Sequence, residues 1–284
     1  LKSVKLKLQH KHKKVRALSR IISIANQKGG VGKTTTSVNL AASLAAYKQR
    51  VLLIDLDPQG NATMGAGIDK HQCKTSVYDV LTEKEAIENV IVSCDKAKIH
   101  LLPANGDLVA AEVELMQEIG RETRLRHALQ RIDGEYDYVI IDCPPSLNML
   151  TVNALVASDS VIIPMQCEYY ALEGLSALNN TIKQIAKLIN PKLKIEGILR
   201  TMYDPRSSLT NAVSAQLRKY FGNRVYRVSI PRNVRLAEAP SHGLPALMYD
   251  RNSKGSVAYL ALAGEIIRQA KDKSEEQQQA DAGQ

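Results

Sequence analysis

The chain has 284 residues and a formal net charge of +9, from 38 Lys and Arg against 29 Asp and Glu. Hydrophobic residues make up 44% and charged residues 24%, a balance typical of a folded globular domain that argues against a mainly disordered or fibrous chain. The longest apolar runs have only the length of a strand, so we expect no segment that crosses a bilayer.

The chain begins with a basic arm, residues 1–19, for which we expect no fixed structure. Residues 1–20 contain eight Lys or Arg and no acidic residue, so this arm carries almost all of the net charge. Its apolar residues are interleaved with lysines, which excludes the continuous apolar core of a secretory signal. Lysine rather than arginine and serine dominates, which disfavours organelle targeting.

Short β-branched runs then alternate with longer segments that carry apolar residues at helical spacing. The expected strands cover residues 20–25, 50–54, 99–102, 138–141, 160–164 and 194–199. The expected helices cover residues 33–48, 107–119, 121–131, 168–189, 208–220 and 254–270. This alternation predicts an α/β fold, a doubly wound and mostly parallel sheet flanked by helices, in one domain of residues 20–270. The polar residues 271–284 predict a disordered tail.

The most informative segment lies between the first expected strand and the first expected helix, and it reads Lys-Gly-Gly-Val-Gly-Lys-Thr-Thr. Glycines let a backbone curl so that its N–H groups and the helix N-terminus converge on phosphate oxygens. Lys33 is placed to reach the β- and γ-phosphates of ATP, and the Thr34 hydroxyl to ligate Mg²⁺. The expected ATP-binding residues here are Lys28, Gly29, Gly30, Val31, Gly32, Lys33, Thr34 and Thr35.

This loop departs from the common phosphate-loop pattern, which requires glycine where the chain has Gln27, and it carries an additional lysine, Lys28. Residues 28–34 fit the pattern K-G-G-x-G-K-[ST] completely, so the segment resembles the deviant Walker A family of P-loop NTPases (SIMIBI class). In that family the first lysine reaches across a nucleotide-sandwich dimer to the partner's phosphates. The resemblance implies that Lys28 is catalytic and that hydrolysis depends on a homodimer.

Two other expected strands end in aspartates, at the position where α/β sheets hold their ligands. Asp55 and Asp57 follow one apolar run, and Asp142 ends another. By resemblance Asp57 orients the attacking water and joins Lys28 and Lys33 as a catalytic residue, whereas Asp55 orders the loop. Asp142 matches the Walker B acid, and we expect it near Mg²⁺, through water. For any one of these aspartates taken singly, the alternative is that it only caps the N-terminus of the helix that follows.

Four longer stretches resemble the ParA/Soj chromosome-partition ATPases, namely residues 55–63, 142–146, 164–174 and 230–243. The resemblance runs from about Arg20 to Ala270 and implies an Mg²⁺-dependent ATPase that forms ADP and phosphate. In that family the Pro-Arg-Asn stretch lies by the adenine, so Pro231 and Asn233 are the expected base contacts. A simple turn before a helix is the alternative.

Members of that family bind duplex DNA without sequence preference once ATP has made the dimer. Residues 200–254 hold 10 basic and 3 acidic residues, whereas residues 55–142 hold 9 basic and 17 acidic. A local basic surface suits phosphate contacts, which supply affinity without reading bases. A solvated basic face is the alternative, and the arm is either an auxiliary DNA-binding segment or an extension without a role. The expected DNA-binding residues are Arg206, Arg235, Arg218, Lys219, Arg224 and Arg227.

The resemblance therefore implies a cytoplasmic, nucleoid-associated homodimer that uses ATP and Mg²⁺. A ParB/Spo0J-type centromere-binding protein would stimulate its hydrolysis, and chromosome or plasmid partition would follow. The polar residues 271–284 disfavour a MinD-like relative, which needs a C-terminal membrane helix. An iron–sulfur relative is disfavoured because neither Cys94 nor Cys167 falls where a second cluster ligand would. A metabolic enzyme acting on a small carboxylate is the other alternative, although no extra substrate domain is found.

Overall fold

A computed structural model describes residues 19–169 and 171–282, and its centre is one eight-stranded sheet. The strand order is β3-β4-β2-β5-β1-β6-β7-β8, and every neighbouring pair is parallel except β3 with β4. The strands are β1 (Arg20–Ile24), β2 (Val51–Asp55), β3 (Val92–Cys94), β4 (Ile99–Leu102), β5 (Tyr138–Asp142), β6 (Ser160–Gln166), β7 (Lys194–Tyr203) and β8 (Val225–Pro231). The predicted fold class is confirmed.

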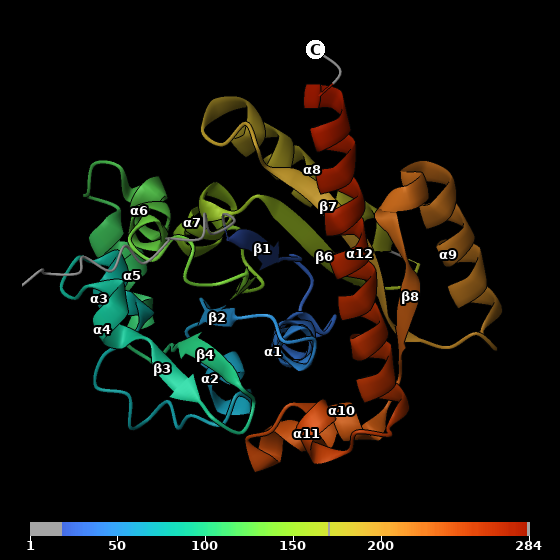
Figure 1. Cartoon of the computed structure of the whole chain (residues 1–284), viewed down its shortest axis with the longest axis horizontal. Helices are drawn as coiled ribbons and strands as arrows, with labels where there is room; N and C mark the ends of the chain where they lie inside the picture. Colours follow the sequence, from blue (N-terminus) through green and yellow to red (C-terminus); the bar gives the residue numbers. More distant parts are fainter. Residues whose placement is uncertain (1–18, 170, 283–284) are drawn as a thin grey trace, which may run out of the picture.

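Helices cover both faces of the sheet (Figure 1). One face carries α1, α2, α10, α11 and α12, and the other carries α3 to α9. Their bounds are α1 (Lys33–Ala46), α2 (Asn61–Gly65), α3 (Val77–Leu81), α4 (Ile87–Val90), α5 (Leu108–Leu115), α6 (Arg124–Gln130), α7 (Met149–Ala157), α8 (Ala171–Leu188), α9 (Ser208–Phe221), α10 (Val234–Glu238), α11 (Ala246–Tyr249) and α12 (Lys254–Ala282). In the part of the chain that is described, no helix is both long and apolar enough to cross a membrane.

The central strands are apolar without interruption because helices bury them from both sides. All five residues of β2 are buried, and its side chains alternate between the two cores. Leu52 and Ile54 pack into one core, and Val51 and Leu53 pack into the other. This explains why runs of consecutive apolar residues, rather than alternating ones, predicted these strands correctly.

The structure adds elements that the sequence reasoning missed. The edge strand β8 alternates polar and apolar residues, so a search for continuous apolar runs did not detect it. The three-residue strand β3 and the short helices α2, α3, α4, α7, α10 and α11 were also missed.

The two ends of the predicted domain differ in what the structure describes. The basic arm, except Ser19, lies outside the described residues. Helix α12 has no break at residue 270, where we predicted a disordered tail to begin, and continues to Ala282. The physical reason is composition: Lys, Glu, Gln and Ala, which fill most of residues 271–282, favour helix, and no Gly or Pro interrupts them.

Candidate nucleotide and DNA-contact sites

The three predicted nucleotide motifs meet at one edge of the sheet. Strands β2, β5 and β1 are adjacent and parallel, so their carboxyl ends lie side by side. Ile24 is in register with Asp142, and Asp142 is in register with Asp55. The loop after β1 therefore begins beside both aspartate-bearing strand ends, at the point where an open α/β sheet binds ligands.

The loop between β1 and α1 has the backbone shape that the glycines predict. Gly30 and Gly32 have φ angles of 72° and 85°, in the left-handed region that favours glycine. A Cβ added to Gly29 or Gly30 would meet no atom within 4 Å, so this side of the loop is open. The hydroxyl of Thr201 on β7 donates to the carbonyl of Val31 over 2.8 Å and anchors the loop.

Asp142 is held by two hydroxyls of the first turn of α1. The Thr34 and Ser37 hydroxyls each donate to one of its carboxylate oxygens over 2.8 Å. The carboxyl is fully buried, and this burial together with the charge of Asp55 raises the pKa of Asp142. A carboxylate and a hydroxyl are hard oxygen donors, so this set fits Mg²⁺. Ser37 was not predicted, because a serine within a helix carries no motif.

The two aspartates after β2 have different surroundings. Asp55 is fully buried and accepts hydrogen bonds from the backbone of Asp57 and from both the backbone and the hydroxyl of Thr63. It thus orders the turn into α2, as predicted. Asp57 is partly exposed, and its carboxylate accepts a bond from the backbone of Gln59 over 2.9 Å.

The two lysines of the loop point to different places. Lys33 is only 7% exposed and donates to the carbonyl of Lys28 over 3.2 Å. Burial lowers the pKa of Lys33, and the charge of Asp142 opposes that effect. The Lys28 side chain is 46% exposed and forms an ion pair with Glu168 over 2.6 Å. Asn26, which sequence reasoning missed, accepts a bond from the Lys28 backbone and fixes the start of the loop.

A cavity of about 200 Å³ joins the loop to the predicted base contacts. Gly32 and Thr35 line it on one side, and Pro231 and Asn233 on the other. The residues that complete it, which the sequence analysis did not single out, are Thr201, Met202, Ile230, Arg232, Leu236, Ala237 and Tyr259. Its place beside the phosphate loop makes it the candidate adenine pocket.

The six predicted DNA-binding residues fall into two groups. Arg206 and Arg235 follow the ends of β7 and β8, which lie together because Tyr203 is in register with Pro231. The other group lies at the opposite end of α9, a helix of 14 residues and thus about 20 Å long. Its members are Arg218, Lys219, Arg224 and Arg227.

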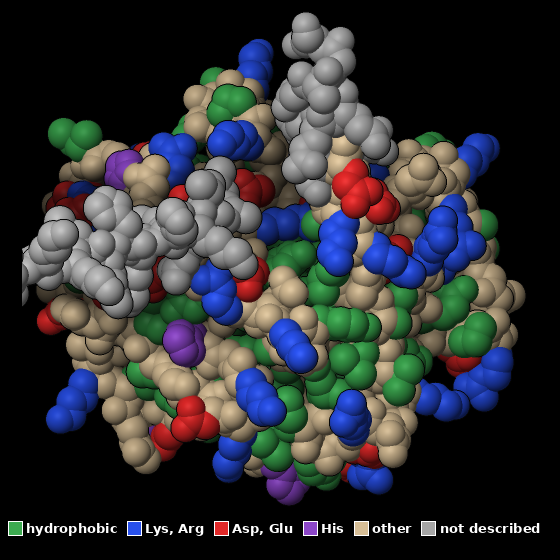
Figure 2. Space-filling view, in the orientation of Figure 1, with side chains coloured by type: hydrophobic (Ala, Val, Ile, Leu, Met, Phe, Trp, Pro, Cys, Tyr) green, Lys and Arg blue, Asp and Glu red, His purple; other side chains and the backbone are tan. Residues whose placement is uncertain are grey.

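A groove of about 760 Å³ lies within the second group, where Arg218, Arg227 and Arg268 line the space between α9, β8 and α12. Figure 2 shows Lys and Arg side chains gathered over α9 and α12. Neither Lys219 nor Arg224 lines this groove.

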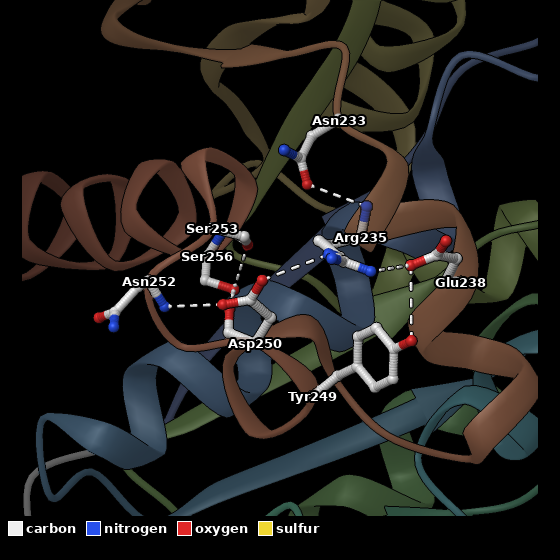
Figure 3. Close-up of polar contacts among 8 residues, drawn as sticks. All are labelled: Asn233, Arg235, Glu238, Tyr249, Asp250, Asn252, Ser253 and Ser256. Atoms are coloured by element: carbon white, nitrogen blue, oxygen red, sulfur yellow. Dashed lines mark hydrogen bonds and ion pairs between the residues drawn. The ribbon is translucent and has the colours of Figure 1, made fainter.

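Arginines of the first group are paired with carboxylates. Arg206 forms two bonds with Asp204, at 2.9 Å each, and these bonds lower the pKa of Asp204 to about 2. Arg235 contacts Glu238 at 2.8 Å and Asp250 at 3.3 Å (Figure 3). By contrast, no member of the second group forms an ion pair with any side chain that the structure describes.

Fold and site together define a P-loop nucleotide-binding protein. A family profile described as an AAA domain, AAA_31, matches residues 19–195. The sporulation initiation inhibitor protein Soj of Bacillus subtilis is 54% identical over 249 residues, which cover 88% of this chain and 98% of that protein. The chromosome partitioning protein ParA of Caulobacter vibrioides is 51% identical, over 89% of this chain and 96% of its own length. The chain belongs to the ParA/Soj family of chromosome-partitioning ATPases, which confirms the predicted resemblance.

Solved structures agree with this assignment. A protein described as cobyrinic acid a,c-diamide synthase from Mycobacterium smegmatis, with a bound ATP analogue and magnesium, is 39% identical, with a TM-score of 0.79 over 89% of this chain and 96% of that one. MinD of Pyrococcus horikoshii with Mg-ADP is 26% identical, with a TM-score of 0.74 over 89% and 97%. The nucleotide and the metal in these neighbours correspond to the predicted cofactors, ATP and Mg²⁺.

Proposed function

We propose that the protein is an ATP-dependent dimerising switch that binds DNA and releases it on hydrolysis, and that it acts in chromosome or plasmid partition. The observation that carries the proposal is the convergence of the glycine loop, Asp57, Asp142 and the cavity at Pro231 and Asn233 on one edge of the sheet. Membership of the ParA/Soj family supports the partition role.

The chain's own groups divide the handling of ATP among them. Backbone N–H groups of residues 29–35 and the Lys33 ammonium bind the phosphates, while Pro231 and Asn233 contact the base. Thr34 would ligate Mg²⁺ directly and Asp142 through water, and the ion would supply charge neutralisation for the transferred phosphoryl group. Asp57, which is partly exposed and follows the carboxyl end of β2, orients the attacking water.

Dimerisation would complete the site through Lys28. Its exposed ammonium lies at the rim of the loop rather than within it, so it is free to contact a second subunit once it leaves Glu168. An exposed ion pair of this kind contributes only about 0–1 kcal/mol, which a phosphate charge readily replaces. The cross-subunit role of this lysine in the family supports the assignment.

Non-specific DNA binding would use Arg206 and Arg235 first, with Arg218, Lys219, Arg224 and Arg227 in support. Guanidinium and ammonium groups bind phosphates without reading base sequence. The protein would then be cytoplasmic and stay bound to the nucleoid until a ParB-type partner stimulates ATP hydrolysis.

The test is a mobility shift with duplexes of unrelated sequence, using the full chain and a chain that starts at Ser19, each without nucleotide, with ADP and with ATP. We expect a shift with ATP for both chains, weaker as salt rises, and equal for all sequences. ATP hydrolysis should increase with DNA and a ParB-type protein together. Binding that ignores both nucleotide and salt would contradict the proposal.

A metabolic role is the second candidate, because a neighbour of 39% identity is described as a diamide synthase. Such an enzyme would activate a small carboxylate at the same phosphate site. ATP turnover that requires the acid and an amide donor, and that ignores DNA, would favour this candidate over the first.

A further inference from the structure

The acidic residues of the basic segment are distributed unevenly. Residues 200–254 contain only three acids, Asp204, Glu238 and Asp250. All three form ion pairs with Arg206 and Arg235, the two arginines expected to lead DNA binding. A surface that served only to attract phosphates would not place its few carboxylates on these two arginines.

Arg235 is the more tightly enclosed arginine, since Glu238 and Asp250 approach it from different elements (Figure 3). Each carboxylate also has a contact of its own. The Tyr249 hydroxyl donates to Glu238 over 3.4 Å, and the second oxygen of Asp250 accepts from the backbone of Asn252 over 3.2 Å. The carboxylates are therefore held in place independently of the arginine, and the three charges together sum to −1.

Helix α10 connects this cluster to the candidate adenine pocket. Asn233 caps the helix by accepting a bond from the backbone of Arg235 over 3.1 Å, and it also lines the cavity. Leu236 and Ala237 line the same cavity from within the helix, whereas Arg235 and Glu238 form the ion pair. A base that enters the cavity thus contacts a helix of only five residues that carries the arginine.

We propose that Glu238 and Asp250 mask Arg235 in the nucleotide-free subunit, and that base binding at α10 releases this arginine to contact a DNA phosphate. The inference rests on the proposed function and adds a regulatory device to it. The side chains of Arg235, Glu238 and Asp250 are 45%, 39% and 37% exposed, so water screens the pairs and a phosphate can replace the carboxylates. While masked, the three charges sum to −1, so Arg235 supplies no net attraction for a DNA phosphate.

The test is DNA affinity of the full chain with and without ATP, measured by fluorescence anisotropy on a labelled duplex, for Glu238→Gln, Asp250→Asn and the double variant. These amides keep the shape and one acceptor oxygen, replace the other oxygen by an NH₂ donor, and remove the charge. We expect nucleotide-free affinity to rise about three- to thirtyfold in the double variant, and the difference between the nucleotide-free and ATP states to shrink. Glu88→Gln, which removes an acid paired with Arg131, is the matched control and should change affinity little.

General loss of negative charge would also raise affinity, so the same substitutions are repeated with Arg235→Ala. Masking requires that the gain disappear in that background. A gain that persists there, or no gain at all, overturns the masking. Arg235→Ala alone tests whether Arg235 contacts DNA at all. If this variant leaves DNA binding with ATP unchanged, the assignment of Arg235 to the DNA surface is wrong, and the masking proposal is wrong with it.

Discussion

Ser37 offers a sharp test of how the buried carboxylate of Asp142 is held. Its hydroxyl donates to Asp142 over 2.8 Å and also lies 3.0 Å from the carbonyl of Lys33. Ser37→Ala removes a donor from a carboxylate that has no access to water. The pKa of Asp142 is already raised by burial, so the loss of a donor falls on a group whose charged form is poorly stabilised.

The size of the effect follows from the chemistry of the bond. At a pH above about 8, where Asp142 is ionised, a hydrogen bond to its charged carboxylate contributes roughly 1.5–3 kcal/mol. In a domain of this size each kcal/mol shifts Tm by about 2–4 °C, so Ser37→Ala should lower Tm by about 3–12 °C. Alanine also favours helix slightly more than serine, which offsets a few tenths of a kcal/mol.

Ser43 on the same helix provides a matched control. It is also fully buried, but its hydroxyl has no hydrogen-bond partner among the residues that the structure describes. Ser43→Ala makes the same chemical change and shares the same gain in helix propensity, so it should be neutral or slightly stabilising. Thermal and urea unfolding of both variants without nucleotide measure the difference. Equal Tm values for Ser37→Ala and Ser43→Ala would refute the role given to the bond with Asp142.

Three further substitutions address the proposed roles. Lys28→Ala should keep ATP binding but lose ATP-dependent dimerisation in light scattering; a variant that dimerises and hydrolyses normally would remove the cross-subunit assignment. Asp57→Ala should bind ATP and stay on DNA while turnover falls by about 100-fold or more, and an unchanged rate would exclude it from catalysis. Arg218→Glu should weaken DNA binding equally with and without ATP, whereas Arg235→Glu should weaken mainly the ATP state; anisotropy titrations separate the two patterns.

Most of the nucleotide site could be predicted because its residues belong to short motifs at strand ends. Asp142, Lys33 and Thr34 lie next to β-branched runs, and parallel strands bring such ends together at one edge. Neither Asn26 nor Thr201 belongs to such a motif. Asn26 donates to the carbonyl of Pro164, and Thr201 donates to the carbonyl of Val31. Both contacts join segments that are distant in sequence, so only the fold reveals them.

The basic surface proposed to bind DNA was predictable in composition but not in arrangement. The excess of basic residues in 200–254 is plain in the sequence, yet the sequence does not separate it into two groups at opposite ends of α9. Arg206 pairs with Asp204 and Arg235 with Glu238, and the partners lie only two or three residues apart. The spacing in the sequence could therefore have predicted both ion pairs. The contact between Arg235 and Asp250 depends on α11 lying against α10, which no local pattern reveals.

The two groups of basic residues differ in their distance from the nucleotide cavity, and therefore in whether a bound nucleotide can affect them. Arg235 lies on a five-residue helix that also lines the nucleotide cavity, so a change at the base reaches it directly. Arg218 lies near the far end of α9, and that end carries no residue of the cavity. If both groups bind DNA as proposed, the remote group, which has no ion pair among the described side chains, would supply weak affinity in every state. The paired group beside the nucleotide would supply affinity only when nucleotide is bound. Such a division would give a partition ATPase nucleotide-dependent DNA binding without a large rearrangement of the fold.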